Sequence, residues 1–142
     1  MSTLNETQTF SLEILTPKGI EMTADCVFAK VPSVNGEMGI LPAHSPAIVQ
    51  LDMGELVIEH ADQQFAYYFI VRGYLQVTKE KAVILTPFLE SLAAIDLNRA
   101  KSAEKRAQSL LASDDQDVDR ERAHLALRRA QQRIHLVEFY RK

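Results

Sequence analysis

The sequence predicts an α+β fold, in which an N-terminal antiparallel β-sandwich is followed by a two-helix antiparallel hairpin. All prolines and glycines lie before residue 88. Apolar residues alternate with polar ones in that part, whereas after residue 96 they recur every three or four residues, and these are the periods of strands and helices. We therefore expect a polar extension over residues 1–9, an all-β domain over residues 10–88, a linker over residues 89–95 and a helical hairpin over residues 96–142.

The expected strands are short alternating runs separated by turns. Phe10, Leu12 and Ile14 alternate with polar neighbours, which predicts a strand with one buried face. Further strands are predicted at 26–31, 55–59, 64–71, 74–78 and 82–86, with turns at 35–36, 61–63 and 79–81. Short strands at close spacing with no helix between them favour an antiparallel sandwich or barrel over a parallel sheet.

Each expected helix has an apolar stripe that is rich in alanine. The stripes consist of Leu97, Ala100, Ala103, Ala107 and Leu110, and of Ala123, Leu127, Ala130, Ile134 and Val137. Asp96 is placed to cap the first helix, and Asp117, Asp119 and Glu121 favour the start of the second. Because alanine buries little apolar area, the hairpin is marginal alone, and we expect it to dock on the sheet, on a partner, or on each at different times.

Composition excludes several classes of protein. The chain has 142 residues, 46% hydrophobic and 25% charged, which excludes disorder, collagen and a disulfide scaffold. A lone Cys26 and the lack of a signal segment predict a reducing, cytosolic compartment. No stretch approaches the roughly 20 apolar residues that a membrane span requires.

Charge is divided unequally along the chain. Residues 1–95 hold 5 Lys/Arg and 11 Asp/Glu, whereas residues 96–142 hold 11 Lys/Arg and 8 Asp/Glu. This shift indicates two units with different partners. Since the net charge is -3 and the arginines alternate with acidic residues, nucleic acid is not an expected partner.

The sequence offers no catalytic or metal-binding constellation. Its histidines, at positions 44, 60, 124 and 135, are scattered, and it contains neither a CxxC pair nor an HxxxH motif. An enzyme is therefore not expected. The segment at 35–39 is interpreted as turn-like, with glycines that supply positive φ angles, rather than as a phosphate cradle.

The arginines of the helical part are candidates for a binding site. Arg99 falls in the first helical turn, where an acidic residue is normally favoured, and such a departure from the local rule marks a candidate site. The alternative is an ion pair with Asp96. On the second helix, Arg122, Arg129 and Arg133 lie near one face and Arg128 is displaced from it, but spacing alone favours a solvated basic face over a binding site.

The run GEMGILPAHSP at 36–46 and the run IDLNRA at 95–100 resemble the epsilon subunit of bacterial F-type ATP synthase. The resemblance extends from about Phe10 to Phe139. It departs from the family at Ala43, where glycine is frequent, and at Ser45, where alanine is frequent.

The resemblance implies a non-catalytic rotor subunit that binds the gamma subunit and the ring of c subunits, and so couples ion transport to ATP synthesis. It places the chain at the cytoplasmic face of the bacterial inner membrane, associated with the membrane only through the complex. The loop with Glu37, Ile40, Leu41, Pro42 and His44 would face the c ring.

The family's C-terminal helices either fold against the sandwich or extend along gamma to the alpha and beta subunits, where they inhibit ATP hydrolysis. Arg122, Arg128, Arg129 and Arg133 would then meet an acidic segment of beta.

In some bacterial members one ATP binds the folded hairpin, so the resemblance implies a regulatory ATP rather than a required cofactor, with the need for Mg left open. The matching positions are Glu90, Ile95, Asp96, Arg99, Ala100, Arg129 and Arg133. The alternative function is a stand-alone ATP-sensing module.

Overall fold

The computed structural model describes residues 8–141, and the chain divides into an N-terminal unit that ends at Leu89 and a C-terminal unit that begins at Glu90. Of the predicted polar extension, residues 1–7 lie outside the described residues, and residues 8 and 9 are exposed coil. Among the described helices, none has the length and apolar character needed to span a bilayer.

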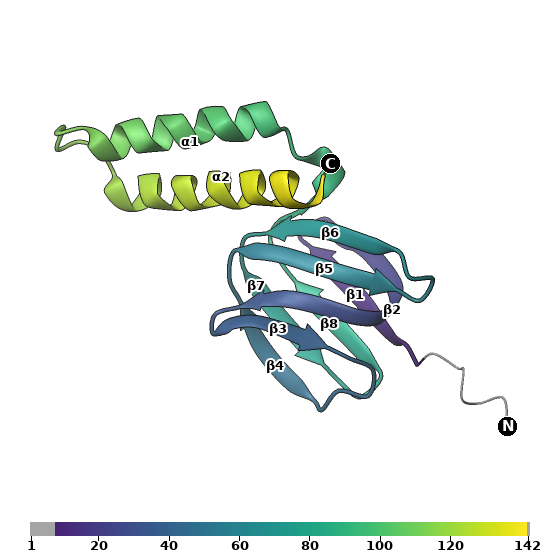
Figure 1. Cartoon of the computed structure of the whole chain (residues 1–142). Coiled ribbons are helices and arrows are strands. Elements are labelled where there is room, and N and C mark those ends of the chain that lie inside the picture. Colours follow the sequence, from purple (N-terminus) through teal and green to yellow (C-terminus); the bar gives the residue numbers. More distant parts are fainter. Residues whose placement is uncertain (1–7, 142) are drawn as a thin grey trace, which may run out of the picture. The chain divides into compact units, whose positions relative to one another are not determined.

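The N-terminal unit is a β-sandwich whose layers are visible in Figure 1. Its strands are β1 (Phe10–Thr16), β2 (Gly19–Ser33), β3 (Gly36–Ile40), β4 (Ala47–Leu51), β5 (Gly54–His60), β6 (Phe65–Ile70), β7 (Gly73–Val77) and β8 (Lys81–Leu85). The short β9 (Leu89–Ser91) crosses the boundary between the units. The predicted fold class is therefore confirmed.

The long strand β2 organises the sheet. Its first half pairs with β1, from Phe10↔Cys26 to Thr16↔Gly19, and its second half pairs with β3 and β5. On one side of β2, neighbouring strands follow in the order β4, β7, β8 and β1. The pairing of β1 with β8 is parallel, whereas β2 pairs in the antiparallel sense with β1, β3 and β5, as do β4 with β7, β5 with β6 and β7 with β8.

The core lies between the layers and is filled by large aliphatic side chains. Phe10, Leu12 and Ile14 are all buried, as their alternation predicts. Leu56, Ile58, Ile70, Leu75 and Ile84 join them from other strands. Burial, with a smaller contribution from the charge of Asp25, raises the pKa of the Cys26 thiol to about 11, so this cysteine is a neutral core residue at pH 7 and not a nucleophile.

The interpretation of residues 35–39 as turn-like holds only for Asn35, because residues 36–39 form most of β3. Gly36 does have a positive φ of 113°. Gly39 serves a different purpose, since a Cβ there would lie 2.9 Å from the Phe28 ring. The glycine therefore lets the ring pack over β3.

The C-terminal unit begins with a 3₁₀ turn, η2 (Leu92–Ala94), and continues with α1 (Leu97–Ala112) and α2 (Arg120–Tyr140). Asp96 and Asp119 cap the helices. The buried residues of α1 are Ala100 and Ala107, and those of α2 are Ala123, Ala130, Leu136 and Val137. Leu110, which was predicted to lie in the buried stripe, is exposed, and Leu136, which was outside it, is buried.

Candidate functional site

The start of α1 is shaped by Asp96. Its carboxylate accepts a hydrogen bond from the backbone N–H of Arg99 at 3.0 Å, and its carbonyl accepts one from the N–H of Ala100, also at 3.0 Å. These bonds satisfy amides that a helix leaves unpaired in its first turn. The contact that the structure shows between Asp96 and Arg99 is thus a helix cap, which leaves the guanidinium of Arg99 available to line a cavity.

That cavity lies between α1 and α2 and has a volume of about 540 Å³. Its lining residues are Glu90, Ala94, Asp96, Arg99, Ala100, Ala103, Arg106, Ala126, Arg129, Ala130 and Arg133. On each helix they are spaced three, four and seven apart, so they share one face. The alanines make room between the helices, and the arginines surround the space that results.

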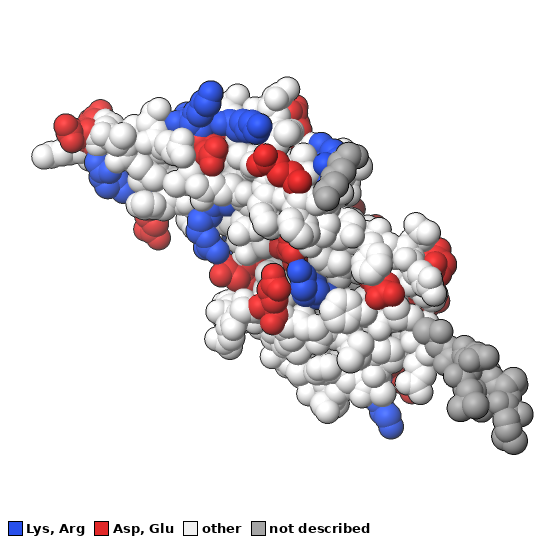
Figure 2. Space-filling view, viewed as in Figure 1, with Lys and Arg blue, Asp and Glu red and all other residues white. Residues whose placement is uncertain are grey.

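The cavity is rich in positive charge. Among its described lining residues, Arg99, Arg106, Arg129 and Arg133 are set against the carboxylates of Glu90 and Asp96. Acidic and basic side chains are interspersed along the helices, whereas the face of the sandwich seen in Figure 2 is mostly uncharged. Planar guanidinium groups bind phosphate oxygens in a bidentate manner, so this lining suits a phosphorylated ligand.

The carboxylate of Glu90 places a negative charge in the lining of this cavity. Its carboxylate oxygen lies 2.7 Å from Nε of Arg133, and both side chains are largely buried. Charge-assisted hydrogen bonds of this length are strong ones. An anionic ligand would therefore have to share Arg133 with Glu90 or displace it.

The structure brings together most of the predicted nucleotide-site residues. Glu90, Asp96, Arg99, Ala100, Arg129 and Arg133 all line the cavity. Ile95 is buried beside it and is not among the lining residues. Arg122 and Arg128 are exposed and lie outside the cavity.

Arg106 is the site residue that the sequence analysis missed. It lies on α1, seven residues after Arg99, and lines the cavity. The same spacing separates Arg122 from Arg129, so a search for arginines two helical turns apart on both helices would have found it.

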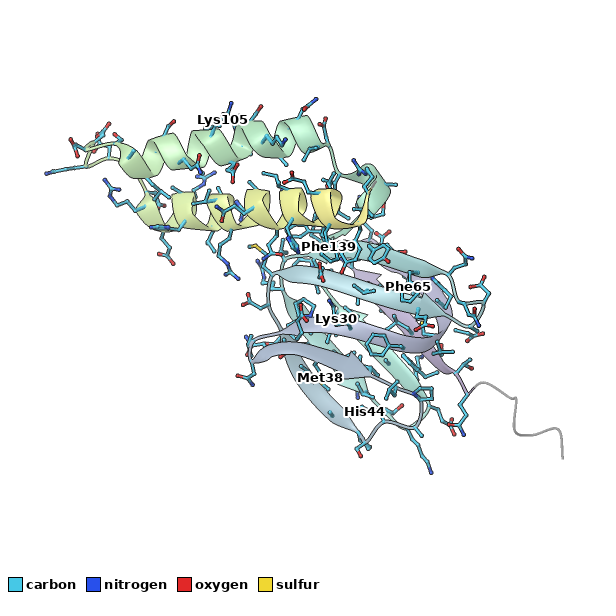
Figure 3. The ribbon with its side chains drawn as sticks, in the orientation of Figure 1. Lys30, Met38, His44, Phe65, Lys105 and Phe139 are labelled. Carbon is cyan, nitrogen blue, oxygen red and sulfur yellow. The ribbon has the colours of Figure 1, made fainter. Side chains whose placement is uncertain are left out.

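A second predicted surface lies at the end of the sandwich. Glu37 on β3 is 67% exposed, and Nζ of Lys30 lies 3.6 Å from its carboxylate and 2.6 Å from that of Glu55. Met38 and His44 lie toward the same end of the sandwich (Figure 3). Nδ1 of His44 is 2.7 Å from the carbonyl oxygen of Ser45.

The prediction that Ile40 faces a partner is wrong. Ile40 is 1% exposed and belongs to the core, because β3 turns alternate residues inward. Leu41, by contrast, is 59% exposed, and Pro42 and His44 are half-buried. Ala43 has a φ of 60°, a left-handed conformation that glycine adopts more readily.

The sandwich also carries an apolar groove of about 550 Å³ along β4, β7 and β8. Tyr74 and Leu85 are cross-strand partners on its floor, and each is about half exposed. Ile48, on the neighbouring β4, is 77% exposed. Exposed apolar residues gathered in this way mark a surface that binds another protein. Among the described residues, no cluster of His, Cys, Asp and Glu is arranged to hold a metal ion.

Comparison with known families accounts for both units. Residues 9–91 match the family model described as the ATP synthase delta/epsilon chain β-sandwich domain, and residues 94–138 match the delta/epsilon chain long α-helix domain. This chain belongs to the ATP synthase delta/epsilon chain family. As an epsilon-type chain it is a stalk subunit of the synthase and not a catalytic one, which agrees with the sequence-based expectation.

Bacterial epsilon chains align with this member over nearly their whole length. It is 33% identical to the ATP synthase epsilon chain of Desulforamulus reducens over 131 residues, which cover 92% of this chain and 98% of that one. It is 35% identical to that of Bacillus velezensis over 127 residues (89% and 96%), and 34% identical to that of Staphylococcus aureus over 131 residues (92% and 97%).

The fold of this family member also matches a solved structure. A chain of the Euglena gracilis mitochondrial ATP synthase, in a structure of OSCP, F1 and the c ring, aligns with a TM-score of 0.81 at 23% identity, covering 90% of this chain and 81% of that one. At this identity the match shows the fold, and it is the sandwich-plus-hairpin fold described above.

Proposed function

We propose that this chain couples the c ring to the catalytic head through gamma and that its hairpin inhibits ATP hydrolysis. The observation that carries the inhibitory role is the seam between α1 and α2, where the buried residues of α1 are alanines. Such a seam stabilises the folded hairpin only weakly. A hairpin of this kind can release α2 to a partner at small energetic cost.

The exposed arginines of α2 support the same proposal. Arg122 and Arg128 are exposed and lie outside the cavity, and in this proposal they meet an acidic segment of the beta subunit. In this proposal the chain sits at the cytoplasmic face of the bacterial inner membrane and reaches the membrane only through the complex. The c ring would meet the exposed Glu37 and Leu41 together with the half-buried Pro42 and His44. The gamma subunit would meet the apolar groove of the sandwich.

We further propose that the cavity between α1 and α2 binds ATP. Its volume lies in the range of small-molecule sites. Arg99, Arg106, Arg129 and Arg133 would hold the phosphates, and the alanines would leave space for the rest of the nucleotide. A ligand present at 100 times its dissociation constant stabilises the state that it binds by about 2.7 kcal/mol, which is enough to shift the hairpin strongly toward its folded form.

Isothermal calorimetry on the full chain tests the nucleotide proposal. We expect saturable heat with millimolar ATP, with and without Mg, and loss of that heat in Arg129→Gln and Arg106→Gln. Lys105→Gln is the matched control, because this residue is exposed on α1 and lies on the side away from α2 (Figure 3). The absence of heat in the unmodified chain would contradict the proposal.

A further inference from the structure

Arg120 ties the turn end of the hairpin together. It is the first residue of α2, and its guanidinium donates to the carbonyl of Leu111 at 2.9 Å and to that of Ser113 at 2.6 Å. The last carbonyls of a helix have no partner within the helix, and a cation is favoured there by the helix dipole. Arg120 therefore anchors the start of α2 to the end of α1.

Arg141 does the same at the opposite end. It is the C-cap residue of α2, and its Nη2 donates to the carbonyl of Leu92 and, at 2.9 Å, to that of Ile95. These carbonyls belong to the 3₁₀ turn and to the residue that follows it, directly before α1. Arg141 therefore anchors the end of α2 to the start of α1.

The two anchors differ in the length of chain that they span. Arg120 contacts carbonyls seven and nine residues away, so its contacts survive wherever the turn stays intact. Arg141 contacts carbonyls 46 and 49 residues away. The Arg141 contacts can therefore form only when α2 runs back along the whole of α1.

We propose that Arg120 and Arg141 are clamps at the two ends of the hairpin, and that release of Arg141 from the turn at residues 92–95 is the step that frees α2. The Arg120 clamp then acts as the hinge. The buried residues of α1 are alanines, which bury little apolar area, so these charge-assisted bonds add to the stability of the closed hairpin. The inference rests on the proposed function in that inhibition requires α2 to leave α1, but its test does not use ATP hydrolysis.

Cysteine reporters in the seam test the clamps on the isolated full chain. Val137 lies one helical turn from Arg141, and Ala123 lies near the Arg120 end. Both are buried, at 4% and 3% exposure, and neither lines the cavity. Val137→Cys and Ala123→Cys are therefore labelled by a thiol reagent only when their end of the hairpin opens. The native Cys26 is fully buried in the other unit and gives a slow background.

We expect Arg141→Gln to accelerate labelling at position 137 about tenfold and to change labelling at position 123 much less, since a hydrogen bond to a charged group changes an equilibrium constant by about a factor of ten or more. Arg120→Gln should show the opposite preference. Arg141→Lys, which keeps the charge but loses the planar fork, should give an intermediate rate, and it carries the test if Arg141→Gln loses helical circular dichroism. Lys105→Gln is the control and should label like the parent chain.

Labelling rates in both arginine variants equal to those in Lys105→Gln would overturn the inference, as would equal acceleration at both reporters. If labelling accelerates as expected but the full chain does not inhibit ATP hydrolysis, the clamps stand and the inhibitory function fails. The two proposals therefore fail in distinguishable ways.

Discussion

The interior of the sandwich and the seam of the hairpin are built from different side chains. The sandwich buries Leu12, Ile14, Leu56 and Ile58 completely, whereas the buried seam of α1 consists of Ala100 and Ala107. A buried leucine contributes about 1.5–3 kcal/mol, and an alanine methyl contributes a fraction of that. The comparison indicates that the sandwich is the more strongly packed of the two units. Under the proposals above, the hairpin is held by a smaller margin, which the polar end contacts and a bound ligand would increase.

Truncating the sandwich core should produce the largest effect. Leu75 on β7 is fully buried in the core cluster, and Leu75→Ala removes apolar contacts and leaves a cavity. We expect the free energy of unfolding of the sandwich to fall by about 2–5 kcal/mol, measured by urea denaturation followed by circular dichroism. A decrease of less than about 1 kcal/mol in the free energy of unfolding would contradict the view that the sandwich is more rigid than the hairpin.

Enlarging the seam should produce an intermediate effect that is confined to the hairpin. Ala107 on α1 is 2% exposed, so Ala107→Leu forces the helices apart and should destabilise the hairpin by about 1–3 kcal/mol. Hydrogen exchange should rise in α1 and α2 and stay unchanged in β5 and β7. Exchange that rises equally in both units would contradict the division into a scaffold and a mobile element.

The pH dependence of the stability of the sandwich offers a sharper test of how its interior is packed. The folded-state pKa of Cys26 is raised to about 11 from an ordinary value of 9.0. As pH rises, the unfolded chain therefore loses the thiol proton before the folded chain does. The contribution of the neutral thiol to the free energy of unfolding is fully present below pH 9 and is lost as pH rises toward 11. Relative to Cys26→Ala, the parent chain should lose stability over this window, by no more than about 2.7 kcal/mol. A difference that does not change with pH would show that water reaches the thiol.

The elements that the sequence predicted well are those with a strong local period. The alternation at Phe10, Leu12 and Ile14 identified β1, and the predicted cap at Asp96 marked the start of α1. The acidic residues at 117, 119 and 121 marked the region in which α2 begins. The sequence analysis missed β3 and β4, because glycines lie within the former and Pro46 directly precedes the latter. Gly39 is required there by the packing of Phe28, a tertiary contact that no local pattern reveals.

The candidate cavity was only partly predictable for a related reason. Residues 96–100 and Arg129 and Arg133 were singled out by motif and spacing. The spacing of Arg106 from Arg99 would have made it a candidate too, but only the observed pairing of α1 with α2 shows that it lines the cavity. Ile40 was misassigned because the resemblance was applied to residues 37–44 as a single loop, whereas Ile40 ends strand β3 and its side chain lies in the core. The predicted stripes wrongly included Leu110, which is exposed, and omitted Leu136, which is buried, because a single stripe does not describe all the sides on which a helix is buried.

The most direct test of the central claim is ATP hydrolysis by the epsilon-free catalytic head, measured with the full chain in one series and with a chain ending at Leu92 in another. The account predicts that both chains bind, because the apolar groove lies in the sandwich, and that only the full chain lowers the rate. Inhibition by the shortened chain, or binding of both chains without inhibition by either, would contradict the claim that the hairpin is the mobile inhibitory element.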